Sequence, residues 1–385
     1  MCNFTILLMI NYLELLSLSS IKRWLAIITQ IPYSAQRSFE ILLSKAVKVI
    51  IFFTLPFMLY IPQAYANSDP VINIWYGSSQ VFGQIGNPQK WVNILGNVTD
   101  EDGIASLVYS LNGDTELPLT IGPDNPRLDA EGDFNIEIDI TDLIAGTNQV
   151  VITARDNLGY QSSETIEAHY VDGKIWPRKY KIDWSAVHNI QEVVQIVDGY
   201  WILEGNSVRS VVKGYDRLIA IGDMVWDNYE VTVPITMHSH GGGYGVGILL
   251  RWIGHYDWDG SQPRWGWFPI GALGWFRNGK LVLQGGGTSL HMEDNSFTLT
   301  PGDCYMFKMR VEKIPGQGFR YSFKIWEDGL IEPSKWNLVG QEDTGDLRNG
   351  SILLVSHRVD ANFGPVSVRP INTAAVVPII LLLAE

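Results

Sequence analysis

Residues 251–277 hold aromatic side chains at an unusual density. The segment RWIGHYDWDGSQPRWGWFPIGALGWFR contains five tryptophans, two phenylalanines and a tyrosine in 27 positions. Gly, Pro, Asp and Ser interrupt any continuous strand in its middle, so the aromatic side chains there either plug the end of a β-sandwich or face solvent. Exposed tryptophan rings stack on the apolar faces of sugars. The candidate ligand-binding residues of this segment are Arg251, His255, Trp258, Trp265 and Trp267.

A second group of reactive side chains is the sequence His238-Ser239-His240. An H-x-H pair on a strand directs both imidazoles to the same side, which suits a metal ion or acid–base chemistry near neutral pH. The alternative is that two histidines beside a glycine-rich turn have no such role. The candidate catalytic residues are His238, His240 and Arg251. The side chains that would complete a metal site, if their loop folded over the strand, are His255, Asp257 and Asp259.

Alternation of residue types assigns Arg251 and Trp252 to opposite faces of one strand. In YGVGILLRWI the bulky side chains, including Trp252, share one face and are expected in the core. Arg251 shares the other face with Gly245 and Gly247. Two glycines on one face leave room for a ligand to approach the sheet closely.

Basic side chains alternate with aromatic ones in CYMFKMRVEKI and FRYSFKIWE. If these strands share a sheet with Arg251, one surface of an acidic protein carries several cations, which favours an anionic or polyhydroxylated ligand. Charges that are simply solvated are the alternative. The further candidate ligand-binding residues on this surface are Arg310 and Lys324.

The elements that must position these residues are strands throughout. From Val71 to Val171 the chain consists of short alternating runs separated by turns such as DEDG, NGD and DNLG. In FNIEIDI the apolar and polar residues lie on opposite faces, as in a half-buried strand. The pattern predicts a β-sandwich of about 100 residues, followed by a larger block of strands.

The first block resembles the bacterial Ig-like and cadherin-like modules of exported proteins. The resemblance rests on GNVTDEDGIASLVYSLNGD, GDFNIEIDI and LIAGTNQVVITARDNLGY, and it spans most of residues 71–171. It implies that acidic turns could bind Ca²⁺ through Asp100, Asp102 and Asp156. The alternative is that Asp and Gly occur there because tight turns favour them.

The second block, residues 181–371, resembles the concanavalin A-like lectin/glucanase superfamily and its laminin-G-like branches. The segments that carry the resemblance are VDGYWILEGNSV, YEVTVPITMH, YGVGILLRW, NGKLVLQGG, YMFKMRVE, FRYSFKIWEDG and GPVSVRPI. The resemblance implies a jelly-roll β-sandwich, and it transfers fold better than function.

Motifs for known chemistry are missing from this block. Jelly-roll glucanases carry two carboxylates on one strand in an E-x-D-x-x-E arrangement, and no such triplet occurs here. The motifs of jelly-roll alginate lyases and a G-x-S-x-G elbow are also absent. The sequence therefore favours a binding protein over an enzyme.

The chain ends carry apolar segments. Residues 43–66 have the order of a secretory signal peptide: two lysines, an apolar run, and Ala64-Tyr65-Ala66. Residues 1–42 fit no standard signal, and either an over-long start site or a membrane anchor would explain them. Without the 5 basic and 2 acidic side chains of residues 1–66, the chain has 23 basic and 39 acidic ones, a formal charge of −16. Such a charge argues against nucleic acid as a partner.

The expected organisation is an all-β chain with a secreted or cell-surface location. It comprises an Ig-like sandwich over residues 67–172, a linker over 173–180, a concanavalin A-like sandwich over 181–371 and an apolar tail over 372–385. The leading functional hypothesis is binding of a polysaccharide or glycan. The alternatives are a glycoside hydrolase or polysaccharide lyase with a non-standard site, and a structural or adhesion module of the cell envelope.

Overall fold

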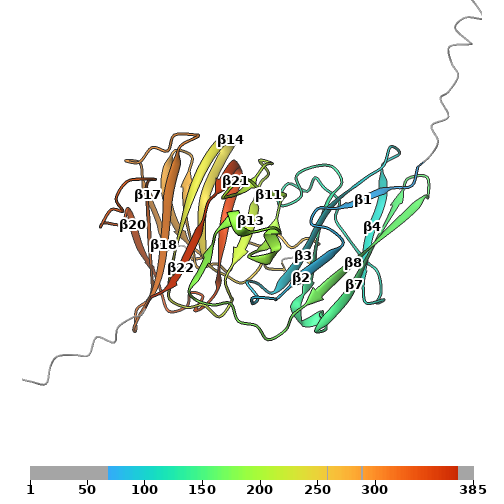
Figure 1. Cartoon of the computed structure of the whole chain (residues 1–385), viewed down its shortest axis with the longest axis horizontal. Helices are drawn as coiled ribbons and strands as arrows, with labels where there is room; N and C mark the ends of the chain where they lie inside the picture. The colour runs from blue at the N-terminus through green and yellow to red at the C-terminus, as the bar shows by residue number, and fades with distance from the viewer. Residues whose placement is uncertain (1–67, 258, 288, 372–385) are drawn as a thin grey trace, which may run out of the picture. The chain divides into compact units, whose positions relative to one another are not determined.

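The computed structural model describes residues 68–371, apart from residues 258 and 288, and these belong to one compact unit (Figure 1). The predicted signal peptide, the apolar tail of 372–385 and the candidate Trp258 lie outside the described residues. Within the described part, the prediction of an all-β chain with a smaller and a larger sandwich is confirmed. No helix in that part is long and apolar enough to cross a membrane.

The smaller sandwich packs a three-stranded sheet on a five-stranded one. The first sheet has the order β1-β3-β6, with β1 (Val71–Ile74), β3 (Trp91–Thr99) and β6 (Asp133–Asp139). The second has the order β2-β8-β7-β4-β5, with β2 (Ser79–Phe82), β8 (Gln161–Tyr170), β7 (Gly146–Asp156), β4 (Ile104–Leu111) and β5 (Leu117–Pro118). A short 3₁₀ helix, η1 (Ile140–Asp142), follows β6. Alternate residues of both sheets fill one apolar core.

Strand β6 is buried on both faces, which differs from the half-buried strand expected for FNIEIDI. Phe134, Ile136 and Ile138 enter the core of the smaller sandwich as predicted. The opposite face carries Asn135 and Glu137, which are each only 1% exposed. Alternation reveals that two faces differ in polarity, but it does not reveal what covers the polar one.

The larger sandwich contains the remaining strands. One series of paired strands runs β10 (Gln195–Asp198), β13 (Arg217–Ile221), β21 (Ser351–Phe363), β14 (Tyr229–Trp252), β15 (Ala272–Arg277), β16 (Lys280–Gly285) and β17 (His291–Asp294). The other strands are β9 (Tyr180–Ile182), β11 (Trp201–Leu203), β12 (Val208–Ser210), β18 (Cys304–Ile314), β19 (Gly318–Glu327), β20 (Leu338–Glu342) and β22 (Val366–Pro370). Two 3₁₀ helices, η2 (Trp184–Ala186) and η3 (Ile190–Glu192), precede β10.

Strand β14 joins the two layers of the larger sandwich. The sequence predicts two strands separated by a turn at HSHGGGYG, but the structure has one strand of 24 residues. Its first half pairs with β18 and its second half with β15, while β21 pairs along both halves. The glycine-rich stretch is therefore a pairing irregularity between His240 and Gly245 within one strand, rather than a turn.

A bulge reverses the faces expected for Arg251 and Trp252. The β14–β21 register shifts between Leu250 and Trp252, and Arg251 has a left-handed φ of 60°. One extra residue exchanges the two faces of a strand. Arg251 is consequently 0% exposed, with its guanidinium carbon 3.8 Å from the Phe319 ring centroid. The prediction that Arg251 lies on an open face of the sheet is therefore wrong.

Trp252 instead lies on a second apolar layer, which we call the covered face. Its members come from β10, β13, β14, β15, β16, β21 and the loop before β15, and Trp267 packs against them. The buried residues of the covered face are Val197, Leu218, Ala220, Leu249, Trp252, Ile270, Leu273, Trp275, Val282, Leu353 and Val355. One layer of the larger sandwich therefore buries both of its faces.

Candidate functional site

The aromatic loop, residues 253–257 and 259–271, is fixed to the smaller sandwich. The side-chain amide of Gln262 forms two hydrogen bonds with the backbone of Glu137, of 3.1 and 3.0 Å. The indole of Trp91 donates to the carbonyl of His255 at 2.8 Å, and the guanidinium of Arg264 stacks 3.8 Å from the centroid of that indole. Since both side-chain and backbone groups are engaged, the loop has a defined conformation over the covered face.

A buried ion network lies beneath this loop. Arg127 is paired with Glu137 at 2.6 Å and with Asp198 at 2.8 Å, and the three side chains are at most 2% exposed. Burial by itself lowers the pKa of Arg127, but the two carboxylates outweigh it and raise the pKa. Burial raises the pKa of Asp198 to about 6, against the opposing charge of Arg127. Such a network fixes a specific arrangement more than it adds stability.

His255 and Trp267 close the loop against the covered face. Their rings are stacked at a centroid distance of 5.7 Å, and Trp252 meets both rings edge-on. His255 is buried, and its burial and the nearby charge of Arg127 hold its pKa well below the usual value. The loop aromatics were expected either to plug the end of the sandwich or to face solvent, and Trp267 mainly packs against the sandwich. His255, predicted to bind a ligand, is buried rather than exposed.

The exposed aromatics of the loop surround a hollow of about 260 Å³. Trp265 is 42% exposed, Phe268 51% and Tyr215 40%. The indole nitrogen of Trp265 donates to Asp259 at 3.2 Å, which orients the ring. We call this feature the aromatic hollow, and its main lining residues are Tyr215, Asp216, His255, Trp265, Trp267 and Phe268.

The carboxylate of Asp216 lies at the wall of the aromatic hollow, and no sequence motif indicated it. Asp216 Oδ1 lies 2.8 Å from His357 Nδ1, and both residues are buried. Burial raises the pKa of Asp216, while the hydrogen bond and charge of His357 oppose that rise. Tyr215 and Trp275 meet the His357 ring edge-on. Because the two residues are 141 positions apart, only the pairing of distant strands brings them together.

Arg310 and Lys324 do not share a surface with Arg251. They lie on the strands β18 and β19, where carboxylates neutralise them: Arg310 bonds Glu230 at 2.5 Å, and Lys324 pairs with Glu332 at 2.7 Å. Lys308 and Arg369 also pair with Glu230. The predicted basic surface is therefore not found, because the carboxylates of Glu230 and Glu332 neutralise these cations and Arg251 lies elsewhere.

His238 and His240 are exposed and engaged separately. His238 Nε2 lies 2.5 Å from Asn362 Oδ1, whereas His240 stacks on Tyr244 with ring centroids 3.7 Å apart. Within residues 68–371, neither histidine belongs to a group of three or more side chains placed to bind a metal. Arg251 is not beside them, since it is buried against Phe319. The predicted convergence of the candidate catalytic residues is therefore not found.

Asp257 and Asp259 stabilise turns of the aromatic loop. Asp257 accepts a hydrogen bond from the backbone of Gly260 at 2.8 Å, and Asp259 accepts one from Ser261 at 3.1 Å. Neither belongs to a metal-type group among the described side chains. They act locally on the loop that carries Trp265.

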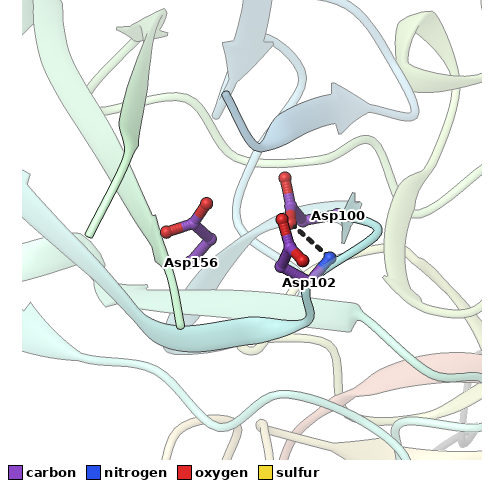
Figure 2. Close-up of side chains that lie close together, drawn as sticks. All are labelled: Asp100, Asp102 and Asp156. Atoms are coloured by element: carbon purple, nitrogen blue, oxygen red, sulfur yellow. Dashed lines mark hydrogen bonds between the residues drawn. The ribbon is translucent and has the colours of Figure 1, made fainter. Parts of the chain in front are cut away.

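Asp100, Asp102 and Asp156 do come together (Figure 2). One oxygen from each carboxylate lies within 4.8 Å of the others, and this is the single such group of metal-ligating side chains among the described residues. Asp100 and Asp102 occupy the turn between β3 and β4, and Asp156 ends β7, which pairs with β4. Pairing of these strands thus brings two distant acidic turns to one place.

The two oxygens of these carboxylates differ in their partners. Asp100 Oδ1 accepts the backbone N–H of Asp102, and Asp156 Oδ1 accepts those of Leu158 and Tyr160. The Oδ2 atoms of Asp100 and Asp156 are buried without a hydrogen-bond partner. Asp156 is only 1% exposed. A buried, unpaired carboxylate oxygen is costly, and a hard cation such as Ca²⁺ is the partner that several such oxygens suit.

The described chain is thus a β-sandwich protein with an aromatic hollow and a separate acidic cluster. No family model and no curated protein matches it. Solved structures with a similar arrangement include the exoplasmic/lumenal domain of VIP36 in its Ca²⁺/Man3GlcNAc-bound form, at 11% identity and a TM-score of 0.35, with 49% of this chain and 87% of that chain covered.

Two further solved structures belong to enzymes. The GH43 protein BlXynB from Bacillus licheniformis shares 11% identity at a TM-score of 0.35, covering 72% of this chain and 63% of that chain. Alginate lyase Aly36B shares 14% identity at a TM-score of 0.30, covering 51% of this chain and 98% of that chain. Likenesses at these values do not identify a function.

Proposed function

We propose that this protein binds a carbohydrate in the aromatic hollow. The observation that carries the proposal is the exposure of Trp265, Phe268 and Tyr215 around one concavity, with the carboxylate of Asp216 at its wall. Aromatic faces take the C–H side of a pyranose ring, and a carboxylate accepts hydrogen bonds from its hydroxyls. The fixed loop keeps these groups in place before binding, which lowers the entropic cost of association.

Each group has a distinct part in this proposal. Trp265 and Phe268 provide the stacking surface, and Asp216 accepts hydrogen bonds from hydroxyl groups while its Oδ1 atom contacts His357. Trp267 and His255 support the loop from below. An exported location, expected from residues 43–66, is part of the proposal because polysaccharides are extracellular.

Loss of the stacking surface tests the proposal. We expect Trp265→Ala to weaken binding of a retained polysaccharide by about 10- to 100-fold, if loss of the stacking ring costs about as much as the 1–3 kcal/mol of an aromatic ring that stacks on a nucleobase. The measurement is affinity electrophoresis against plant, algal and bacterial polysaccharides, followed by calorimetry with the ligand that retards the wild type.

Tyr200→Ala is the matched control, because Tyr200 is a similarly exposed aromatic in another hollow, beside Trp75. Equal affinity of wild type and Trp265→Ala, with loss in Tyr200→Ala, would move the site to that hollow. Retention by no polysaccharide would favour the structural or adhesion alternative. The enzyme alternative receives no support from His238, His240 and Arg251, which do not converge.

We further propose that Asp100, Asp102 and Asp156 bind Ca²⁺ and stabilise the smaller sandwich, as its Ig-like and cadherin-like resemblance implies. The buried, unpaired Oδ2 atoms of Asp100 and Asp156 carry this proposal. A ligand that binds only the folded state at 100 times its Kd adds about 2.7 kcal/mol to the free energy of unfolding. We therefore expect millimolar Ca²⁺ to raise Tm, as measured by calorimetry with and without EDTA.

Asp156→Asn separates the metal role from the turn role. The amide oxygen of Asn still accepts the N–H groups of Leu158 and Tyr160, so the calcium-free protein should remain folded. The rise in Tm with Ca²⁺ should disappear. Glu116→Gln, which removes an exposed charge elsewhere in the same sandwich, should keep it. A wild-type Tm unaffected by Ca²⁺ would show that the three aspartates serve their turns alone.

A further inference from the structure

A second hollow adjoins the aromatic hollow. It also measures about 260 Å³, and the two share Tyr215 as a lining residue. The chain between Pro123 and Asp129 contributes walls to both. We call it the basic hollow, and its residues used below are Asp129, Lys213, Tyr215 and Arg358.

Lys213 and Arg358 give the basic hollow its charge. Both are exposed, and neither has a carboxylate within 4.0 Å among the residues that the structure describes. The contrast with neighbouring cations is clear, because Arg127, Arg209 and Arg217 all have acidic partners. In a chain with a formal charge of −13, two cations that form no ion pair with a described carboxylate leave a local positive charge in this hollow.

The nearby carboxylates are engaged elsewhere. Asp129 also lines the basic hollow, but it lies 3.6 Å from Arg217. Asp360 is held by Arg209 at 2.8 Å. Neither acid therefore lies at ion-pairing distance from Lys213 or Arg358, although the charge of Lys213 contributes, after Arg209 and His238, to the lowered pKa of Asp360.

Arg358 has an unusual backbone conformation, and its side chain lines the basic hollow. Arg358 has a left-handed φ of 54°, and its N–H donates to the carbonyl of Gly214 at 2.8 Å. Its guanidinium carbon lies 5.3 Å from the Tyr215 ring centroid, and Nη1 donates to Gly242 at 3.1 Å. Left-handed backbone is unfavourable for arginine, and such conformations cluster at functional positions. Most of the guanidinium donors remain available to a ligand.

We propose that the two hollows form one binding groove for an acidic oligosaccharide. A sugar ring stacks on Trp265 and Phe268, and the carboxylate or sulfate group of a neighbouring residue in the chain binds Lys213 and Arg358. Tyr215, which borders both hollows, contacts both parts. The inference rests on the proposed carbohydrate function and names the class of its ligand. Arginine suits this role because it binds carboxylate and sulfate through paired N–H donors.

Matched ligands test the charge requirement. The probes are tetragalacturonic acid, its methyl ester, and a sulfated galactan tetrasaccharide with its unsulfated counterpart, each titrated by calorimetry at low and high salt. We expect the wild type to prefer one acidic probe over its uncharged counterpart, and salt to weaken that preference. The uronate and sulfate arms distinguish the two sources of the anionic group.

The variant Lys213→Gln/Arg358→Asn removes both charges, and Asn accommodates the left-handed backbone at residue 358. We expect it to lose about 10- to 100-fold in affinity for the acidic probe and little for the uncharged one. Arg348→Ala, an exposed cation outside the groove, should leave both affinities unchanged. Unaltered circular dichroism and Tm would confirm that the double variant is folded.

The outcomes separate this inference from the proposed function. Equal wild-type affinity for acidic and uncharged probes, with loss of both in Trp265→Ala, would overturn the anionic assignment and leave the aromatic site standing. Unchanged acidic-probe affinity in the double variant would overturn it as well. Binding of none of the probes, with a neutral polysaccharide still retained through Trp265, would overturn the anionic assignment alone, whereas retention by no polysaccharide would overturn both proposals.

Discussion

His255 illustrates how a single buried residue couples folding to pH. Its pKa is lowered mainly by burial and further by Arg127, and Glu137 is the nearest carboxylate, at 3.8 Å from Nδ1. Below the unfolded-state pKa of about 6.5, the unfolded chain binds a proton at this position that the folded chain does not. This residue therefore stabilises the fold least at low pH, and its contribution to stability increases as the pH rises towards 6.5.

The corresponding prediction concerns a comparison of two proteins at two pH values. When the pH falls from about 7.5 to about 5.5, protonation of His255 in the unfolded chain should lower the free energy of unfolding by about 1.4 kcal/mol. The variant His255→Gln should lack this part of the pH-dependent decrease. Urea unfolding of both proteins measures it. The buried Asp198 and Asp216, whose pKa values are raised, act in the opposite direction. They are common to both proteins, so an identical pH dependence of wild type and variant would contradict the prediction.

At the scale of the element, strand β6 and the aromatic loop show what the sequence can and cannot predict. Alternation correctly assigned the core residues of β6 and of β19. It did not predict that the polar side of β6 is buried, because the covering loop is more than 100 positions away, as in the bond from Glu137 to Gln262. Local patterns describe a strand and its nearest turns, whereas long-range coverage depends on how distant elements pack.

The same limit explains the outcome for the individual site residues. The grouping of Asp100 and Asp156 could be predicted because each stands in a recognisable acidic turn, and the strands that carry them are neighbours. The exposure of Trp265 could be predicted because its loop is rich in turn residues. Asp216 and His357 were missed because neither lies in a motif. The burial of Arg251 was missed because a left-handed arginine at a bulge has no sequence signal.

For the molecule as a whole, Arg127 provides a buried ionic link between the two sandwiches. It follows the smaller sandwich's β5, pairs with Glu137 of β6, and reaches Asp198 at the end of β10 in the larger sandwich. The carbonyls of Val197 and Arg264 also accept its N–H groups. A group that satisfies partners from both sandwiches makes their unfolding cooperative, because loss of either one leaves buried charges unpaired.

Removing Arg127 should therefore weaken and uncouple the two sandwiches. We expect Arg127→Met to lower the free energy of unfolding by about 3 kcal/mol, since two buried carboxylates lose their closest cation and keep only Arg264 and Arg217, at 3.7 and 3.9 Å. Calorimetry should show one transition for the wild type and two for this variant. Arg127→Met/Glu137→Gln/Asp198→Asn should recover much of the loss by removing the unpaired charges. Arg178→Met, which breaks an exposed ion pair with Asp227, should change stability by at most about 1 kcal/mol. A single transition at an unchanged temperature in Arg127→Met would show that the loop and the apolar covered face, rather than this ion network, join the two sandwiches.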